Sequence, residues 1–273
     1  MIKIASKYVK DPIALTKKLL YALAILLFVL VICVLLLAII GPRTVFKEDP
    51  KPIVTEDFSE RPATLGSTLD FGDHYIDSTI FLGDYTTANI SGHNLLVGSS
   101  AAYQVWSGEN GDIPLDANIK NASIFIEATE DTKPLSLLLA QRRPERIIIT
   151  LGISNGVSYC DEEAFSDYYQ SLIDLVKENS PDTVIILQSI FPITKKAEKQ
   201  NPSISNARID QANEWIYSLA EKNGVHFLYT ASALKDAKGN LDPEYAESDG
   251  VNLDYDGYKA VLRYIRTHGT YTK

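Results

Sequence analysis

Four short polar loops hold the residues whose types could do chemistry. In chain order they are Gly83 to Thr87, Gly98 to Ser100, Gly152 to Gly156 and Asp249 to Asn252. They contain carboxylates, hydroxyls and amides, the groups that bind polar ligands and take part in proton transfer. These groups can act together only if the fold brings the loops to one place.

Short runs of β-branched and apolar residues accompany these loops and are typical of buried strands. The predicted strands are Ser78 to Leu82, Asn94 to Val97, Arg146 to Leu151, Thr183 to Gln188 and Val225 to Tyr229. Apolar positions spaced by three and four residues predict helices at Asp161 to Lys177, Ile209 to Lys222 and Tyr255 to His268.

The alternation of strands with helices predicts an α/β fold, because parallel strands need helical crossovers that cover both faces of the sheet. We therefore expect a three-layer α/β/α sandwich with a central five-stranded parallel sheet of the flavodoxin-like type. In such sheets the ligand site lies beyond the carboxyl ends of the strands. The four loops are predicted to converge there.

Four segments resemble sequence blocks of the SGNH, or GDSL, hydrolases. "TIFLGDYTTANI" resembles the block that contains the nucleophilic serine, and "LLVGSSAAY" the block whose glycine N–H helps to form the oxyanion hole. "IIITLGISNG" resembles the block with the oxyanion-hole asparagine, and "SDGVNLDYDGYKAV" the block with the catalytic Asp and His. The resemblance implies the SGNH-hydrolase fold for most of the chain after the first 66 residues.

The same resemblance implies that the catalytic set is degenerate. The nucleophile position holds Tyr85 and the base position holds Asn252, while Gly98 and Asp249 keep their family residue types. The asparagine donor position holds Ser154, unless a local shift lets Asn155 serve. An amide cannot accept a proton at neutral pH, and a phenol without a base is a poor nucleophile. We therefore expect a pseudoenzyme, and no residue is assigned as catalytic.

The resemblance makes acylated carbohydrates the ancestral ligand class, so the expected function is binding of a cell-envelope glycan, or an accessory role. The expected binding residues are Asp84, Tyr85, Gly98, Ser99, Ser154, Asn155, Asp249 and Asn252, with Tyr103, Trp106 and Tyr159 as further stacking faces or core residues. Two alternatives stay open: an active ester hydrolase or O-acetyl esterase or transferase with a non-standard site, and a scaffold for a membrane enzyme complex.

Cysteine and histidine offer few further candidates. Cys160 is either a replacement nucleophile served by His74 or His93, or a small buried residue. His226 lies within a predicted strand and is interpreted as a core residue. The histidines lack the spacing of metal ligands, so neither a metal nor a cofactor is expected.

The region before the predicted domain contains a long apolar segment. Leu19 to Ile40 has no charged residue and, at about 1.5 Å per residue, is long enough as a helix to cross a bilayer core. Five lysines precede it, and acidic residues follow it. The positive-inside rule then predicts a single-pass membrane protein with a cytoplasmic N-terminus and an extracytoplasmic C-terminal domain. A cleaved signal peptide is the alternative, although the apolar core exceeds the usual 7 to 15 or so residues.

The chain therefore divides into a basic tail (1–18), a transmembrane helix (19–41), a Pro-containing linker (42–66) and an SGNH-hydrolase-like domain (67–273). Part of the linker, around Ile53 and Phe58, is alternatively an edge segment that packs on the domain. The formal net charge is -9. The short tail has more basic than acidic residues, so the rest of the chain is strongly acidic. An acidic domain without a basic stripe repels phosphate backbones, so nucleic acid is not an expected partner.

Overall fold

The computed structural model describes residues 21, 23, 26–27, 58–98 and 101–271. The predicted basic tail, nearly all of the predicted membrane span and linker residues 42–57 lie outside the described residues. Within the part of the chain that is described, no helix combines the length and the apolarity needed to cross a membrane. The membrane anchor and the orientation of the chain therefore stay predictions.

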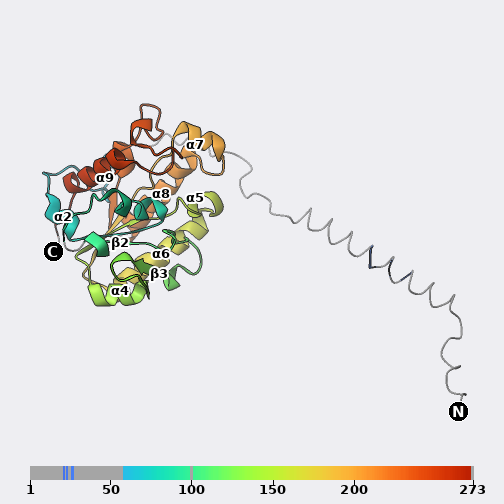
Figure 1. Cartoon of the computed structure of the whole chain (residues 1–273), viewed down its shortest axis with the longest axis horizontal. Helices are drawn as coiled ribbons and strands as arrows, with labels where there is room; N and C mark the ends of the chain where they lie inside the picture. The colour runs from blue at the N-terminus through green and yellow to red at the C-terminus, as the bar shows by residue number, and fades with distance from the viewer. Residues whose placement is uncertain (1–20, 22, 24–25, 28–57, 99–100, 272–273) are drawn as a thin grey trace, which may run out of the picture. The chain divides into compact units, whose positions relative to one another are not determined.

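The central sheet has five strands in the order β2-β1-β5-β6-β7, and every neighbouring pair is parallel. Figure 1 shows the elements of the domain coloured along the chain, with its helices around the sheet. The strands are β1 (Thr79–Gly83), β2 (Val105–Trp106), β5 (Arg146–Thr150), β6 (Val184–Gln188) and β7 (His226–Leu228). Four of the five predicted strands are thus confirmed within one or two residues. The prediction of a five-stranded parallel sheet is confirmed as well.

The predicted strand Asn94 to Val97 is wrong. Asn94 has a left-handed backbone (φ 53°) that ends a short 3-10 helix, Ser91–His93, and Val97 is 57% exposed. The missing strand is instead β2, which has only two residues. A two-residue strand leaves no apolar run in the sequence. Leu95 and Leu96 give the sequence a strand-like apolar run because they pack on the core, but they do so from a loop.

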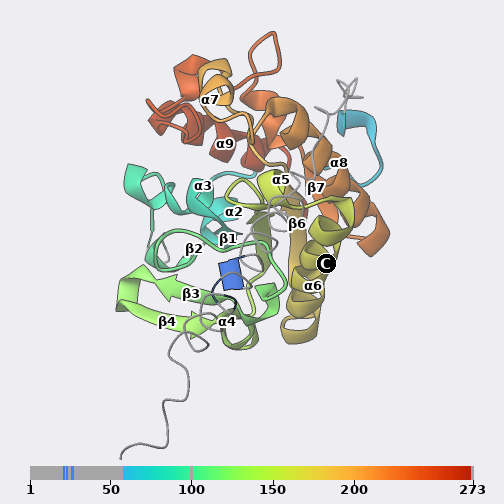
Figure 2. The ribbon, with the colours of Figure 1, turned by 90° about the vertical axis from the view of Figure 1, so that its right-hand side faces the viewer.

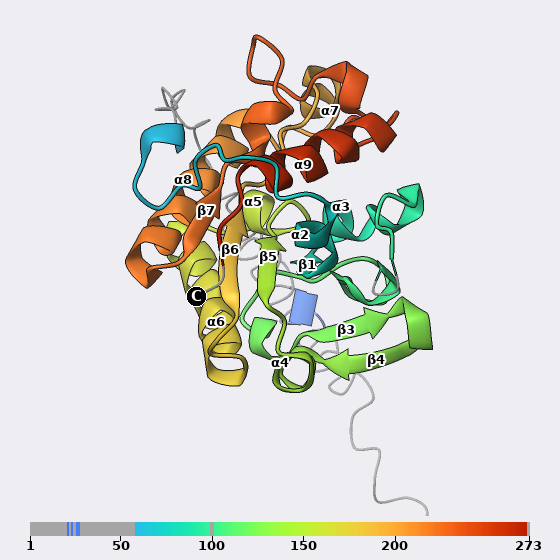
Figure 3. The ribbon, with the colours of Figure 1, turned by 90° about the vertical axis from the view of Figure 1, so that its left-hand side faces the viewer.

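Helices cover both faces of the sheet because consecutive strand side chains point to opposite sides. On β5, Ile147 and Ile149 face a core built with α4 (Leu135–Arg142), α6 (Glu162–Asn179) and α8 (Asn206–Asn223). Ile148 faces the other core, formed with α2 (Asp73–Asp77) and α9 (Tyr255–Thr267). The three-layer prediction is therefore confirmed, and Figure 3 shows α6 and α8 beside β6 and β7, with α9 and α2 near β5 and β1.

The remaining elements lie in the connections. An antiparallel hairpin of β3 (Ser123–Ile126) and β4 (Asp131–Pro134) follows β2 and contacts α4 (Figure 2). Three short helices follow strands: α3 (Tyr85–Ala88) after β1, α5 (Gly156–Tyr159) after β5 and α7 (Lys195–Gln200) after β6. Each of them therefore begins at or near the carboxyl edge of the sheet.

The last part of the predicted linker belongs to the domain. Residues 63–65 run parallel to β7: Leu65 N–H donates to Phe227 O and Phe227 N–H donates to Ala63 O, both at 2.8 Å. Phe58 is fully buried, with its ring 4.6 Å from that of Tyr229. Phe58 and residues 63–65 of the predicted linker therefore pack on the domain, as in the edge-segment alternative stated for Phe58. This segment covers the outer edge of β7, which protects it from pairing with another chain.

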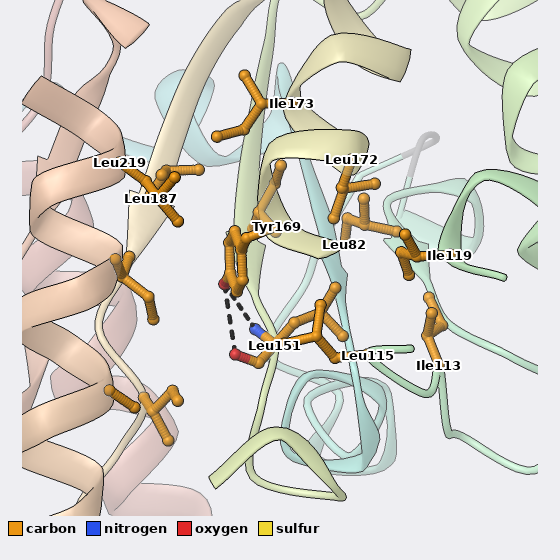
Figure 4. Close-up of a cluster of buried hydrophobic side chains, with 14 of the residues drawn as sticks. Leu82, Ile113, Leu115, Ile119, Leu151, Tyr169, Leu172, Ile173, Leu187 and Leu219 are labelled. Atoms are coloured by element: carbon orange, nitrogen blue, oxygen red, sulfur yellow. Dashed lines mark hydrogen bonds between the residues drawn. The ribbon is translucent and has the colours of Figure 1, made fainter. Parts of the chain in front are cut away.

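One buried tyrosine anchors the carboxyl end of β5. The Tyr169 hydroxyl of α6 accepts from the Leu151 N–H at 3.2 Å and lies 3.3 Å from the Leu151 carbonyl, to which it donates (Figure 4). Leucine and isoleucine side chains surround it in the core drawn there. The loop after β5 therefore starts from a fixed point.

Candidate functional site

The loop after β1 begins with a residue that has to be small. A Cβ on Gly83 would lie 2.0 Å from the Thr87 hydroxyl and 2.4 Å from the Thr150 carbonyl oxygen. Only glycine allows β1 to approach β5 so closely at this point. The chain then turns directly into α3, which brings Asp84 and Tyr85 to the carboxyl end of the sheet.

Asp84 joins two of the predicted site loops. One carboxylate oxygen accepts from the backbone N–H and the hydroxyl of Thr86, at 3.2 and 2.9 Å, and so caps α3. The other accepts from the N–H groups of Gly152 and Ile153, both at 3.1 Å. Asp84 is 1% exposed, and this burial raises its pKa to about 6, although the hydrogen bonds act in the opposite direction. Asp84 therefore acts as a structural clamp between the loops after β1 and β5.

Tyr85 is the first residue of α3 and is partly buried against the core. Burial raises the pKa of its phenol well above the ordinary value, and the nearby carboxylates of Asp84, Asp249 and Asp112 raise it further. The hydroxyl is therefore protonated at neutral pH. In this state it is a weak nucleophile.

The loop after β5 does not present its asparagine as a free donor. The Asn155 amide oxygen accepts from Leu115 N–H at 2.9 Å, and its amide nitrogen donates to Leu115 O at 3.3 Å. Asn155 therefore holds the 115 loop in place. The Ser154 hydroxyl oxygen is buried and has no hydrogen-bond partner within the described residues.

Asp249 and Asn252 form a hydrogen-bonded pair before α9. The Asn252 amide nitrogen donates to Asp249 at 2.6 Å, and its amide oxygen accepts from the Asn89 amide at 2.7 Å. Asp249 also accepts from the N–H groups of Val251 and Asn252. Partial burial favours a higher pKa for Asp249, but these hydrogen bonds outweigh it and lower the pKa below its ordinary value. Asp249 is thus ionised at neutral pH.

Contacts between α3 and α9 bring this pair to the Tyr85 loop. The Tyr258 hydroxyl of α9 donates to Thr86 O at 2.6 Å, and Asn89 N–H donates to Tyr85 O at 3.1 Å. Asn89 therefore lies one helical turn after Tyr85 and also contacts Asn252. Asn89 and Tyr258 were not predicted as site residues, because a lone asparagine and a core-spaced tyrosine give no signal in a single sequence.

Gly98 lies elsewhere. A Cβ on Gly98 would lie 3.6 Å from the Asp77 carboxylate, and Asp77 ends α2, which precedes β1 at the amino edge of the sheet. Its predicted membership of the site is therefore not supported by the geometry. Its neighbour Ser99 lies outside the described residues.

The loop after β2 takes the place expected for Gly98. It runs from Ser107 to Asp112, and a Cβ on Gly111 would lie 3.2 Å from Ala88 Cβ and 3.9 Å from Tyr85 Cα. Gly111 has a positive φ of 74°, which favours glycine. The signal in the sequence was the Gly-rich stretch directly after Trp106, which could be assigned to the site only once β2 was known.

The other candidate side chains mostly belong to the core or lie apart. Trp106 is 1% exposed and donates to Tyr103 O, whereas Tyr159 is 80% exposed. Cys160 is buried, and burial raises the pKa of its thiol, so the thiolate needed for nucleophilic attack is disfavoured. His93 packs against the ring of Tyr258, with 5.1 Å between centroids. Among the described residues, no group of three or more His, Cys, Asp or Glu side chains is placed to hold a metal.

A large groove lies on a different part of the surface. It has a volume of about 690 Å³ and runs along α9, and the rest of its wall is formed by α2, Leu95, Val97, Glu244 and Tyr245. Neither Tyr85 nor Asn252 lines it. The groove is therefore separate from the convergence of the loops after β1, β2 and β5 with the segment before α9.

Comparison with known proteins places this geometry in a family. No curated protein matches the chain. A GDSL-like lipase from Bacteroides thetaiotaomicron superposes with a TM-score of 0.47 and 17% identity over 70% of this chain and 87% of that one. A catalytic mutant of an acetylxylan esterase from Geobacillus stearothermophilus gives a TM-score of 0.43 and 19% identity over 71% of this chain and 94% of that one. Residues 81–260 match the GDSL-like lipase/acylhydrolase family, and the chain belongs to that family.

Proposed function

We propose that this domain binds a cell-envelope carbohydrate without hydrolysing it, and that residues 19–41 tether it to the outer face of the membrane. The binding site is where the loops after β1, β2 and β5 meet the segment before α9, and it is called the Tyr85 site below. The observation that carries the proposal is the hydrogen bonding of Asn252. It donates to Asp249 and accepts from Asn89, so the position of the family base holds an amide engaged on both sides. The site has no general base at that position.

The nucleophile position supports the same proposal. A protonated Tyr85 fills the place of a small serine, and the Asn155 amide is hydrogen-bonded to the backbone of Leu115. Loss of a single member of a serine triad leaves only about 10³ to 10⁴ over water. Polar side chains around an aromatic ring remain suited to carbohydrate, since sugars combine hydroxyl groups with apolar faces.

The hydrolysis experiment uses the full-length protein and p-nitrophenyl acetate. We expect turnover at background for the wild type, about 10³-fold or more below an intact triad. A triple variant, Tyr85→Ser, Ser154→Asn and Asn252→His, places a serine, a donor and a base at the family positions. It is expected to fold, because Ser154 and Asn252 lie on loops and Tyr85 is the first residue of the short helix α3, and to gain measurable turnover.

A rate above background in the wild type that disappears in Tyr85→Phe would contradict the proposal and favour the active esterase. Binding is measured separately, by retention of the protein on purified cell-wall glycan. The Tyr85→Ala variant should lose retention. Its thermal unfolding transition, measured alongside, should remain cooperative although it shifts to a lower temperature, because the ring packs partly on the core. No retention of the wild type on any wall polymer would remove the binding function.

A further inference from the structure

Two exposed carboxylates lie on segments next to Tyr85. Asp249 is held beside α3 through Asn252 and Asn89, as described above. Asp112 follows Gly111, where an added Cβ would lie 3.9 Å from Tyr85 Cα. Asp249 and Asp112 are both exposed, whereas Asp84, which precedes Tyr85, is buried. Tyr85 thus has two accessible anionic residues on neighbouring segments.

The charges that reach the two site tyrosines are all negative. Asp84, Asp112 and Asp249 act on Tyr85, and Glu247 acts together with Asp84 and Asp249 on Tyr258. The lysines on neighbouring elements are paired with acids of their own: Lys195 with Glu198, and Lys259 with Asp256. The field over the ring therefore favours a cation.

The site also has hydrogen-bonding capacity to spare. A carboxylate offers about four acceptor positions, and the described contacts of Asp249 use three of them. The buried Ser154 hydroxyl, on the loop that binds Asp84, has no partner within the described residues. Both observations fit a bound group that donates hydrogen bonds, such as an ammonium or a hydroxyl.

We propose that the Tyr85 site selects glycans that carry a free, protonated amine, such as de-N-acetylated hexosamine units, over their N-acetylated counterparts. The inference rests on the proposed carbohydrate-binding function and narrows its ligand class. The ammonium group lies against the Tyr85 ring and pairs with Asp249 and Asp112. Acetylation removes this charge and with it both interactions.

The test compares glucosamine pentamer (free amines) with N-acetylglucosamine pentamer, each titrated calorimetrically into the full-length protein. We expect the free-amine pentamer to bind about tenfold more tightly at low salt, since a cation–π contact and a charge-assisted hydrogen bond are each worth a sizeable part of the 1.4 kcal/mol that corresponds to tenfold. The preference should shrink in 0.5 M NaCl, because salt screens accessible charges.

Charge variants separate the site from the overall acidity of the protein. Asp249→Asn and Asp112→Asn should each reduce the preference about threefold or more. The matched control is Asp182→Asn, an exposed residue just before β6 at the opposite edge of the sheet, which should leave the preference unchanged. Unfolding temperatures of all variants show whether the fold is kept.

Equal or tighter binding of the acetylated pentamer would overturn this inference and leave carbohydrate binding standing. An equal effect of Asp182→Asn would overturn it as well, because the preference would then reflect net charge. Failure of both pentamers to bind, together with no retention on wall glycan, would remove the proposed function itself.

Discussion

Asp84 and Asp249 are both carboxylates of the candidate site, but their surroundings differ. Asp84 is buried and accepts hydrogen bonds from two loops, so its side chain joins the segments that follow β1 and β5. Asp249 is largely exposed and accepts from its own turn and from Asn252. Asp84 thus joins two loops, whereas Asp249 takes part in the local network of the turn before α9. Under the proposed function, the Asp84 clamp would position loops for binding and not for catalysis.

The largest expected effect concerns the clamp. Asp84→Ala leaves the buried N–H groups of Gly152 and Ile153 without acceptors and removes the cap of α3. We expect a loss of about 4 kcal/mol in the free energy of unfolding, as each buried unsatisfied donor costs about 1 to 3 kcal/mol. Urea denaturation measures it. A loss below about 1 kcal/mol would show that the loops hold without Asp84.

The second effect is the pH dependence of stability that comes from Asp84. Burial raises its pKa from 3.8 to about 6, so its contribution to stability is full below about pH 3.8 and is lost as the pH rises through 6. Two pKa units correspond to about 3 kcal/mol. The difference in unfolding free energy between wild type and Asp84→Asn should therefore change by about that amount between pH 4 and 7. A flat difference would contradict the raised pKa.

Asp249 should show the opposite sign and a smaller effect. Its lowered pKa means that its contribution is present above the ordinary pKa of an aspartate and is lost as the pH falls. Solvent screens this largely exposed group, so Asp249→Asn should change the unfolding free energy at pH 7 by less than about 1 kcal/mol. Thermal denaturation at several pH values measures it. A loss as large as that of Asp84→Ala would mean that both carboxylates are structural.

A fourth variant tests whether the amide network is needed for binding alone. Asn89→Ala removes the donor to Asn252 on an exposed residue of the loop after α3. We expect a change in unfolding free energy within about 0.5 kcal/mol, as for other surface substitutions, together with weaker retention on wall glycan. Unchanged retention would place the ligand away from Asn252.

Much of the fold could be predicted because long apolar strands and amphipathic helices leave periodic patterns. The strand at Arg146–Thr150 and the helix at Tyr255–Thr267 are examples, found within one or two residues of their predicted bounds. The two-residue β2 leaves no such pattern. The sequence instead predicts a strand at Asn94 to Val97, and this places the following Gly98 at the site. The error shows that a glycine in a loop cannot be assigned to a block before the strand that leads to it is known.

The residue types themselves determine that Tyr85 and Asn252 cannot act as a serine and a histidine, since an amide cannot take up a proton whatever surrounds it. The period of the apolar residues likewise predicts the α/β sheet, at whose carboxyl edge the candidate site is expected. Only the tertiary structure decided that Asn252 lies between Asp249 and Asn89, that Asn155 is bound to Leu115, and that the loop containing Gly111 approaches Tyr85. These are contacts between residues far apart in the chain, and their formation depends on packing that no local pattern encodes.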